Sequence, residues 1–227
     1  MSRSQLLKDL VGGNTSIENI LLRLKIILND LENEMIMGWV NGELAGYKEK
    51  GTVPKYRILK GSPIGTFIVN QRFKYTDSQV PLESLLSREE IDSIITLDVL
   101  DSIATLQTIL DGENRDRYAK QISTALCHSI SVNDLQIAGM NVMIPSNQLD
   151  GIVSHVKSKL VEVILELEKQ FVKLDDLDIR LQIDENSSKK EQVIYNIEQI
   201  IYEGSIEIGD KNKLQRSKLG KWFGGKE

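Results

Sequence analysis

The feature that most constrains the fold is a periodic run of apolar residues near the middle of the second half of the chain. Its members recur at alternating steps of four and three: Leu149, Val153, Val156, Leu160, Val163, Leu167 and, in the same register, Leu174. This spacing predicts one apolar face of a long helix, which Ser146 or Asn147 is placed to cap. Such a seam suits a bundle core or a coiled-coil contact. Because other amphipathic stretches are available, packing within one molecule is favoured.

Three further stretches have helical spacing. Residues 17–35 predict one continuous helix that starts at a Thr15–Glu18 capping box. Residues 91–110 predict another, after a Ser87–Glu90 box, and residues 118–130 a third. A short helical segment is expected at residues 4–11.

Two regions favour extended structure instead. Between residues 52 and 75, prolines and glycines separate the β-prone runs YRIL and TFIVNQRF, which predicts edge strands or an ordered loop. The run LQIAGMNVMIP also reads as extended. Near the C-terminus, DENSSKKEQ has the polar composition of a linker, and the alternation of Val193, Tyr195 and Ile197 predicts strands after it.

These patterns predict a mainly α fold: a helical bundle with a small β or extended insertion at about residues 52–75. The expected organisation is a helical domain at residues 1–183, a linker at 184–192, and a short β-rich appendage with a basic tail at 193–227.

Composition limits the function classes. The net charge of −5 argues against a protein whose whole surface binds nucleic acid. A single cysteine, Cys127, excludes an intramolecular disulfide and indicates a reducing compartment. No apolar run approaches the roughly 20 residues that cross a bilayer, and the N-terminal stretch is too short and charged for a signal peptide. We therefore expect a cytoplasmic protein.

The stretch GWVNGELAGYKEKGTVPKYR contains the strongest candidate site. On a helix, Trp39, Glu43 and Tyr47 share one face, and Tyr56 and Arg57 return after a turn. One hypothesis is a recognition surface in which an Arg–Glu pair orients the aromatic side chains. The alternative is a structural brace, which is favoured because aromatic and ion-pair clusters usually serve packing.

Other chemical signals are weaker. Cys127 and His128 are adjacent in sequence, so on a helix they point apart, and a buried structural cysteine is favoured over a nucleophile. Asp175 and Asp176 lie in an acidic cluster without a calcium-loop pattern, and an acidic loop is favoured over a metal site. Nucleotide-cradling and serine-hydrolase motifs are absent from the sequence. We expect no cofactor and no catalytic constellation.

The last residues, KNKLQRSKLGKWFGGKE, are basic and contain two aromatic side chains. They form a hypothetical contact surface for a partner groove, a membrane surface or nucleic acid, with residues Lys213, Arg216, Lys218, Lys221, Trp222 and Phe223. A solvated terminus is an equally weighted alternative. Contact with nucleic acid or membrane is assigned to this tail alone.

Two segments resemble the AbiTii family of bacterial proteins, named for predicted abortive-infection toxins. The first is WVNGELAGY with VPKYR, whose matching residues are Trp39, Glu43, Leu44, Gly46, Tyr47, Pro54, Tyr56 and Arg57. The second is LDGIVSHVKSKLVEVILELEK, whose matching residues are Gly151, Ile152, Val156, Lys157, Leu160, Leu165, Glu166, Leu167 and Glu168. Lys157 stands where the family pattern has an arginine, which removes a planar bidentate donor. The resemblance covers about residues 4–174.

The resemblance implies a role in anti-phage defence but identifies no reaction. The leading hypothesis is a module that acts by self-association or by binding a protein partner, rather than as an enzyme. One rival is a metal-dependent nuclease or phosphodiesterase toxin, with Glu43, Arg57, Asp175 and Asp176 as candidate groups. Another is an antitoxin or structural adaptor.

Overall fold

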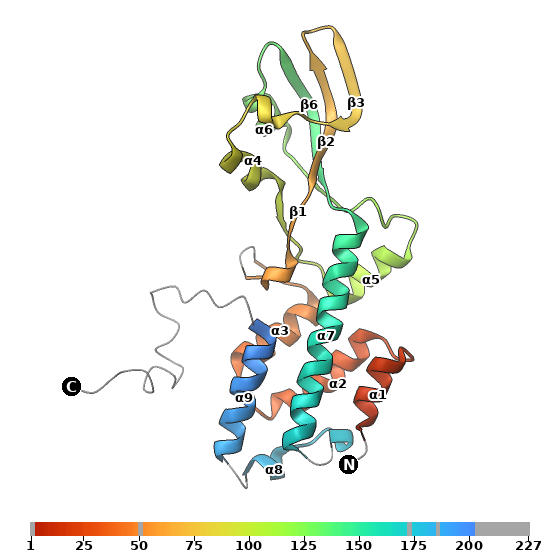
Figure 1. Cartoon of the computed structure of the whole chain (residues 1–227), viewed down its shortest axis with the longest axis vertical. Helices are drawn as coiled ribbons and strands as arrows, with labels where there is room; N and C mark the ends of the chain where they lie inside the picture. The colour runs from red at the N-terminus through yellow and green to blue at the C-terminus, as the bar shows by residue number, and fades with distance from the viewer. Residues whose placement is uncertain (1–2, 50–51, 172–173, 185–186, 203–227) are drawn as a thin grey trace, which may run out of the picture.

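The computed structural model describes residues 3–49, 52–171, 174–184 and 187–202. They form an elongated molecule with a helical body at one end and a sheet lobe at the other, joined by a narrow neck (Figure 1). Helices make up 57% of the structure and strands 18%, in sheets of two and four strands. The fold is therefore mixed α/β, and the prediction of a mainly α-helical bundle is wrong.

The helical body buries the apolar stripes that the sequence predicts. It contains α1 (Gln5–Gly12), α2 (Ile17–Asn29), α3 (Glu34–Ala45), α7 (Ser146–Gln170), η3 (Leu174–Asp176), α8 (Arg180–Asp184) and α9 (Ser187–Tyr202). The long helix α7 runs from the neck through the body (Figure 1), and Leu149, Val156, Leu160, Val163 and Leu167 on it are fully buried. Among the described residues, no helix has the length and apolar composition needed to cross a membrane.

The predicted continuous helix over residues 17–35 is two helices. Helix α2 ends at Asn29, the backbone of Glu32 has a φ of 54°, and Asn33 caps α3 by accepting a hydrogen bond from the backbone N–H of Ile36. A left-handed residue cannot continue a right-handed helix, so the apolar spacing persists across a turn. The first cap is Ser16, one residue after the predicted Thr15.

The sheet lobe has its own hydrophobic core. Its antiparallel sheet has the order β3-β2-β6-β5 and contains β2 (Ser62–Val69), β3 (Phe73–Gln79), β5 (Ala119–Gln121) and β6 (Leu135–Met143). Helices α4 (Arg88–Ile95) and α6 (Thr124–Ile130) and the turn η2 (Leu82–Ser84) pack on one face. The extended reading of LQIAGMNVMIP is confirmed by β6. Strand β2 is interior rather than at an edge.

Two predicted helices, one in the neck and one in the sheet lobe, each include a strand in the structure. Strand β1 (Ile58–Lys60) pairs with β4 (Thr96–Asp98), beside η1 (Lys55–Arg57) and α5 (Ile103–Asp111). The predicted helix over residues 91–110 is therefore interrupted by a strand, although its Ser87–Glu90 capping box is present. Likewise, residues 118–130 divide into β5 and α6. In both cases a distant strand supplies backbone partners that helical spacing does not reveal.

The predicted β-rich appendage is contradicted over residues 193–202, which belong to α9. Val193, Ile197 and Ile201 recur every four residues and are fully buried. Packing of this helix face against α7 and α3 outweighs the strand-like alternation of apolar residues in the local sequence. The same helix includes residues 187–192, which the sequence assigns to a linker. Residues 203–227 lie outside the described residues.

Candidate functional site

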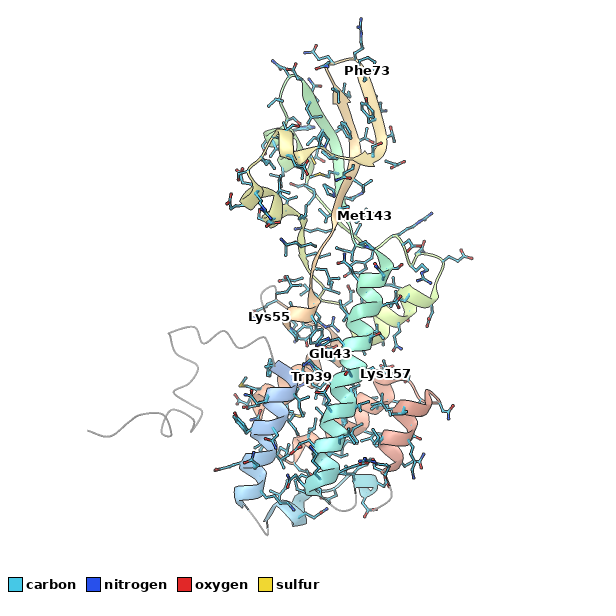
Figure 2. The ribbon with its side chains drawn as sticks, in the orientation of Figure 1. Trp39, Glu43, Lys55, Phe73, Met143 and Lys157 are labelled. Carbon is cyan, nitrogen blue, oxygen red and sulfur yellow. The ribbon has the colours of Figure 1, made fainter. Side chains whose placement is uncertain are left out.

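The five residues of the strongest sequence candidate contact one another, and Trp39 and Glu43 among them lie where the body joins the neck (Figure 2). Trp39 and Glu43 lie on α3, Tyr47 follows its end, and Tyr56 and Arg57 lie on η1. We call this group the neck clasp. Tyr56 and Arg57 both contact Glu43 of α3, so η1 lies against that helix.

A buried ion pair forms the centre of the neck clasp. Arg57 Nη2 lies 2.5 Å from Glu43 Oε2, and Arg57 Nε donates to Glu43 Oε1 at 3.0 Å. Both side chains are 0% exposed. This two-point contact has the geometry that guanidinium and carboxylate groups favour. Arg57 Nη1 also donates to the carbonyl oxygens of Val99 (3.1 Å) and Asp101 (2.7 Å), which ties the ion pair to the segment after β4.

Three aromatic residues complete the network. The hydroxyls of Tyr47 and Tyr56 each donate to Glu43 Oε1 at 2.8 Å, and the indole N–H of Trp39 donates to the Tyr56 hydroxyl at 2.8 Å. The Tyr56 ring stacks on His155 of α7, with centroids 4.6 Å apart. The neck clasp therefore joins α3, η1 and α7.

The electrostatics of the neck clasp keep its charges fixed. Burial raises the pKa of Tyr47 and Tyr56, and the negative charge of Glu43 raises both further. Burial opposes the charge on Arg57, but hydrogen bonding and attraction to Glu43 outweigh it, so the pKa of Arg57 is raised. Both tyrosines therefore stay neutral and Arg57 stays charged at physiological pH.

Two glycines explain the local sequence pattern. A Cβ on Gly42 would lie 2.4 Å from the Tyr47 ring, so only glycine leaves space for that ring. Gly46 has a φ of 85°, and a Cβ there would lie 2.8 Å from the Leu100 carbonyl oxygen. The next residue, Tyr47, donates its backbone N–H to the same oxygen at 2.8 Å. The segment GELAGY is thus shaped to place Tyr47 over Glu43.

This arrangement is suited to bracing rather than to chemistry. Trp39 is 1% exposed, and the acid and base groups of the ion pair are sealed from solvent. Among the described residues, no buried side-chain nitrogen or oxygen lacks a hydrogen-bond partner. A general base must reach the proton that it removes, and Glu43 is already occupied by Tyr47, Tyr56 and Arg57. The geometry favours the structural alternative, and the nuclease hypothesis loses its two best residues.

The other candidate groups are not assembled into a site. Cys127 is buried in the lobe core, where burial raises the pKa of its thiol, whereas His128 is exposed. Asp175 accepts a hydrogen bond from the backbone N–H of Gln5 at 2.8 Å. Within the described ranges, no three His, Cys, Asp or Glu side chains are grouped as metal ligands. The candidate tail residues 213–223 lie outside the described residues.

Sequence reasoning missed an exposed apolar surface on the sheet lobe. Phe73 is 55% exposed, Tyr75 46% and Val132 53%, and Figure 2 places Phe73 at the tip of the lobe. Phe73 pairs with Val69, Val69 with Leu135, and Leu135 forms a bridge to Val132. We call Val69, Phe73, Tyr75 and Val132 the tip patch. The alternation of aromatic and polar residues over 73–76 was its sequence signal.

Comparison with known proteins gives one match. A family model described as AbiTii matches residues 4–193. This range includes the neck clasp, the whole described sheet lobe and the first part of α9. No curated protein and no solved structure matches the chain.

Proposed function

The chain belongs to the AbiTii family, an abortive-infection family, and from that premise we propose that it defends bacteria against phage by binding a protein. The partner is either a second copy of the chain or another protein. The sheet lobe is the recognition element, and the neck clasp holds it in position on the body.

The tip patch is the observation that carries this proposal. Exposed aromatic and β-branched side chains that adjoin one another mark interaction surfaces on soluble domains. Phe73 lies at the end of the lobe farthest from the body (Figure 2). Val69 lies opposite it on β2, and Tyr75 follows two residues later on β3. Val132 bridges Leu135, which pairs with Val69. A projecting surface of this kind gives a partner access that the buried neck clasp does not.

Phage challenge of bacteria that express the chain tests this function. We expect the wild type to reduce plaque formation, and Phe73→Ser to lose about tenfold of that protection, as expected for one interface anchor. Ile26→Ser is the matched control, because Ile26 is 53% exposed but lies on α2 in the body. Equal losses from both variants would contradict the assignment to the lobe. A wild type without any protection would contradict the defence role.

Expression without phage separates the remaining alternatives. A toxin arrests growth when expressed alone, whereas an antitoxin or adaptor is harmless alone. The readout is the growth rate after induction, with the wild type compared with Phe73→Ser at equal protein levels. Growth arrest that Phe73→Ser relieves would assign the toxicity to the contact made by the lobe.

The basic tail is a second proposed contact surface, supported by its sequence alone. Deleting everything from residue 184 would also remove the buried residues of α9, so that truncation would damage the body. Replacing Lys213, Arg216 and Lys218 by Gln removes charge and leaves the described fold unchanged. Unaltered binding of these variants to nucleic acid, anionic vesicles and protein would contradict a role for the tail.

A further inference from the structure

Strand β3 offers an unpaired edge. The sheet order is β3-β2-β6-β5, so in the described part of the chain β3 is hydrogen-bonded to β2 on one side and to no strand on the other. It has seven residues and contains no proline. A strand of this kind is a template on which another extended segment can form backbone hydrogen bonds.

The side chains along this edge have a defined pattern. Phe73 pairs with Val69 and Tyr75 pairs with Phe67, so both aromatic rings lie on the face that the lobe helices partly cover. The Tyr75 ring stacks on Phe67 with centroids 5.1 Å apart. Lys74 lies between them and points to the opposite face. A complementary strand therefore needs the order apolar, acidic, apolar.

Several segments of the chain have that order, and one of them follows Tyr202, the last described residue. Residues 205–208 read SIEI, and the surrounding EGSIEIGD contains three acidic residues and no basic one. In an antiparallel pairing, Ile206 would lie opposite Tyr75, Glu207 opposite Lys74, and Ile208 opposite Phe73. Cross-strand pairs of an aromatic with a β-branched residue, and of opposite charges, each stabilise a sheet.

The segment cannot reach β3 of its own copy. Tyr202 donates its hydroxyl to the Met35 carbonyl in the body, at the start of α3. Four extended residues span at most about 14 Å, so Ile206 of the same copy cannot lie farther than that from Tyr202. Phe73 lies beyond the neck, at the far end of β2, whose eight residues alone span about 25 Å. Only a second copy can supply this strand.

We propose that residues 205–208 of one copy add as a fifth strand to the edge of β3 in a second copy. This inference specifies the self-association in the proposed function and rests on it to that extent. Direct pairing of two β3 strands is disfavoured, because pairing Phe73 with Tyr75 between two copies would place the two Lys74 side chains opposite each other. The occupant is therefore the acidic segment and not β3 itself.

A charge-swap experiment on the full chain tests the pairing. Sedimentation velocity over a range of concentrations gives the dissociation constant of the self-associated wild type. We expect Lys74→Glu and Glu207→Lys each to raise that constant about fivefold, and the double variant to return it to within about twofold. Lys8→Glu is the control, because Lys8 is an exposed cation on α1 and should leave association unchanged.

Hydrogen exchange supplies an independent measurement. Amides of residues 73–76 should gain protection as the wild-type concentration rises, and the Glu207→Lys variant should not show this gain. A wild type that is monomeric at every concentration would overturn the proposal, as would protection of β3 that does not depend on concentration. Association that withstands both single variants, or that the double variant fails to restore, would also overturn it.

The failure of this inference is distinguishable from failure of the proposed function. A monomeric chain that still protects bacteria from phage would refute strand exchange and leave the defence role intact. A chain that passes the charge-swap test but gives no protection against phage would support strand exchange and refute the defence role.

Discussion

At the scale of single residues, Glu43 is the most constrained side chain in the neck. It accepts four hydrogen bonds, from Tyr47, Tyr56 and two nitrogens of Arg57, without contact with solvent. Burial of two charges is tolerated only when each is paired and its hydrogen bonds are complete. The neck clasp meets both conditions. Removing one of its charged partners should therefore lower the stability of the fold far more than breaking an ion pair on the surface.

Replacing Glu43 by Gln tests this directly. Glutamine keeps the shape of the glutamate side chain but leaves the Arg57 charge buried without a counter-ion. We expect the substitution to lower the free energy of unfolding by about 3–5 kcal/mol. Urea denaturation followed by circular dichroism measures the change. Glu49→Gln, on an exposed residue beyond the end of α3, should stay within about 0.5 kcal/mol. Similar values for both variants would contradict the bracing role.

Two glycines on α3 provide a matched pair of substitutions. Gly42→Ala places a methyl group 2.4 Å from the Tyr47 ring, whereas Gly38→Ala meets no atom within 4 Å. We expect Gly42→Ala to destabilise by about 1–3 kcal/mol through overpacking. Gly38→Ala should stabilise by about 0.5–1 kcal/mol, because alanine favours the helix. Thermal unfolding compares the two, and a common sign would contradict this account of the GELAGY pattern.

At the scale of elements, α9 is a helix that the sequence did not predict, and its packing against the body stabilises it. Its Val193, Ile197 and Ile201 are buried in the body core. Polar contacts add to this packing: Asn196 donates to Glu166 of α7 at 2.7 Å, and Asn33 donates to Glu198 at 2.9 Å. Lys159 donates to the Ile200 carbonyl, so a cation on α7 binds the C-terminal end of α9.

The contact of Glu166 with α9 predicts a pH dependence. Burial opposes its charge, but hydrogen bonds from Asn196 and Lys169 outweigh this, so the pKa of Glu166 is lowered below its ordinary 4.5. A lowered folded-state pKa stabilises the fold above the unfolded value, and this contribution is lost as the pH falls through the folded value. The charge of Glu166 therefore stabilises the fold at neutral pH and not in acid.

The Glu166→Gln variant isolates that contribution. Its stability should fall below that of the wild type at pH 7, and the difference should shrink as the pH is lowered towards 3. Urea denaturation at both pH values measures the difference. A gap of the same size at both values would show that the carboxylate charge does not stabilise the α7–α9 contact.

At the scale of the whole molecule, the chain contains two hydrophobic cores connected through the neck. The body core and the lobe core share no residue. The neck clasp and the β1–β4 pairing link them. Most of the buried apolar residues belong to the body core, and the lobe projects from the body with a smaller core of its own.

Separate cores predict separate local unfolding. Ile137 is 1% exposed in the lobe core, and Ile137→Ala should weaken it by about 2–5 kcal/mol. Hydrogen exchange should rise in β2, β3 and β6 and stay unchanged in α2 and α7, because contiguous regions open as cooperative units. Leu160→Ala, in the body core, should give the opposite distribution. An equal rise throughout the chain would instead indicate one cooperative unit.

Much of the body core could be predicted from the sequence. The stripe from Leu149 to Leu167 lies in one helix, and the Ser87–Glu90 cap is present. Glu43 and Arg57 could be grouped, because a turn returns the chain over α3. The Val99 and Asp101 carbonyls that complete the Arg57 contacts could not, since they lie 42 and 44 residues away. The tip patch also depends on strands far apart in sequence.

The sequence by itself determined which side chains needed burial, because the spacing of apolar residues is a local property of the chain. Tertiary structure decided whether the segments with ambiguous spacing became helices or strands. Residues 96–98 and 193–202 have patterns compatible with either, and the outcome depended on which distant segment supplied backbone partners or a packing face. The same long-range pairing decided that the sheet would project from the body with β3 as an edge strand.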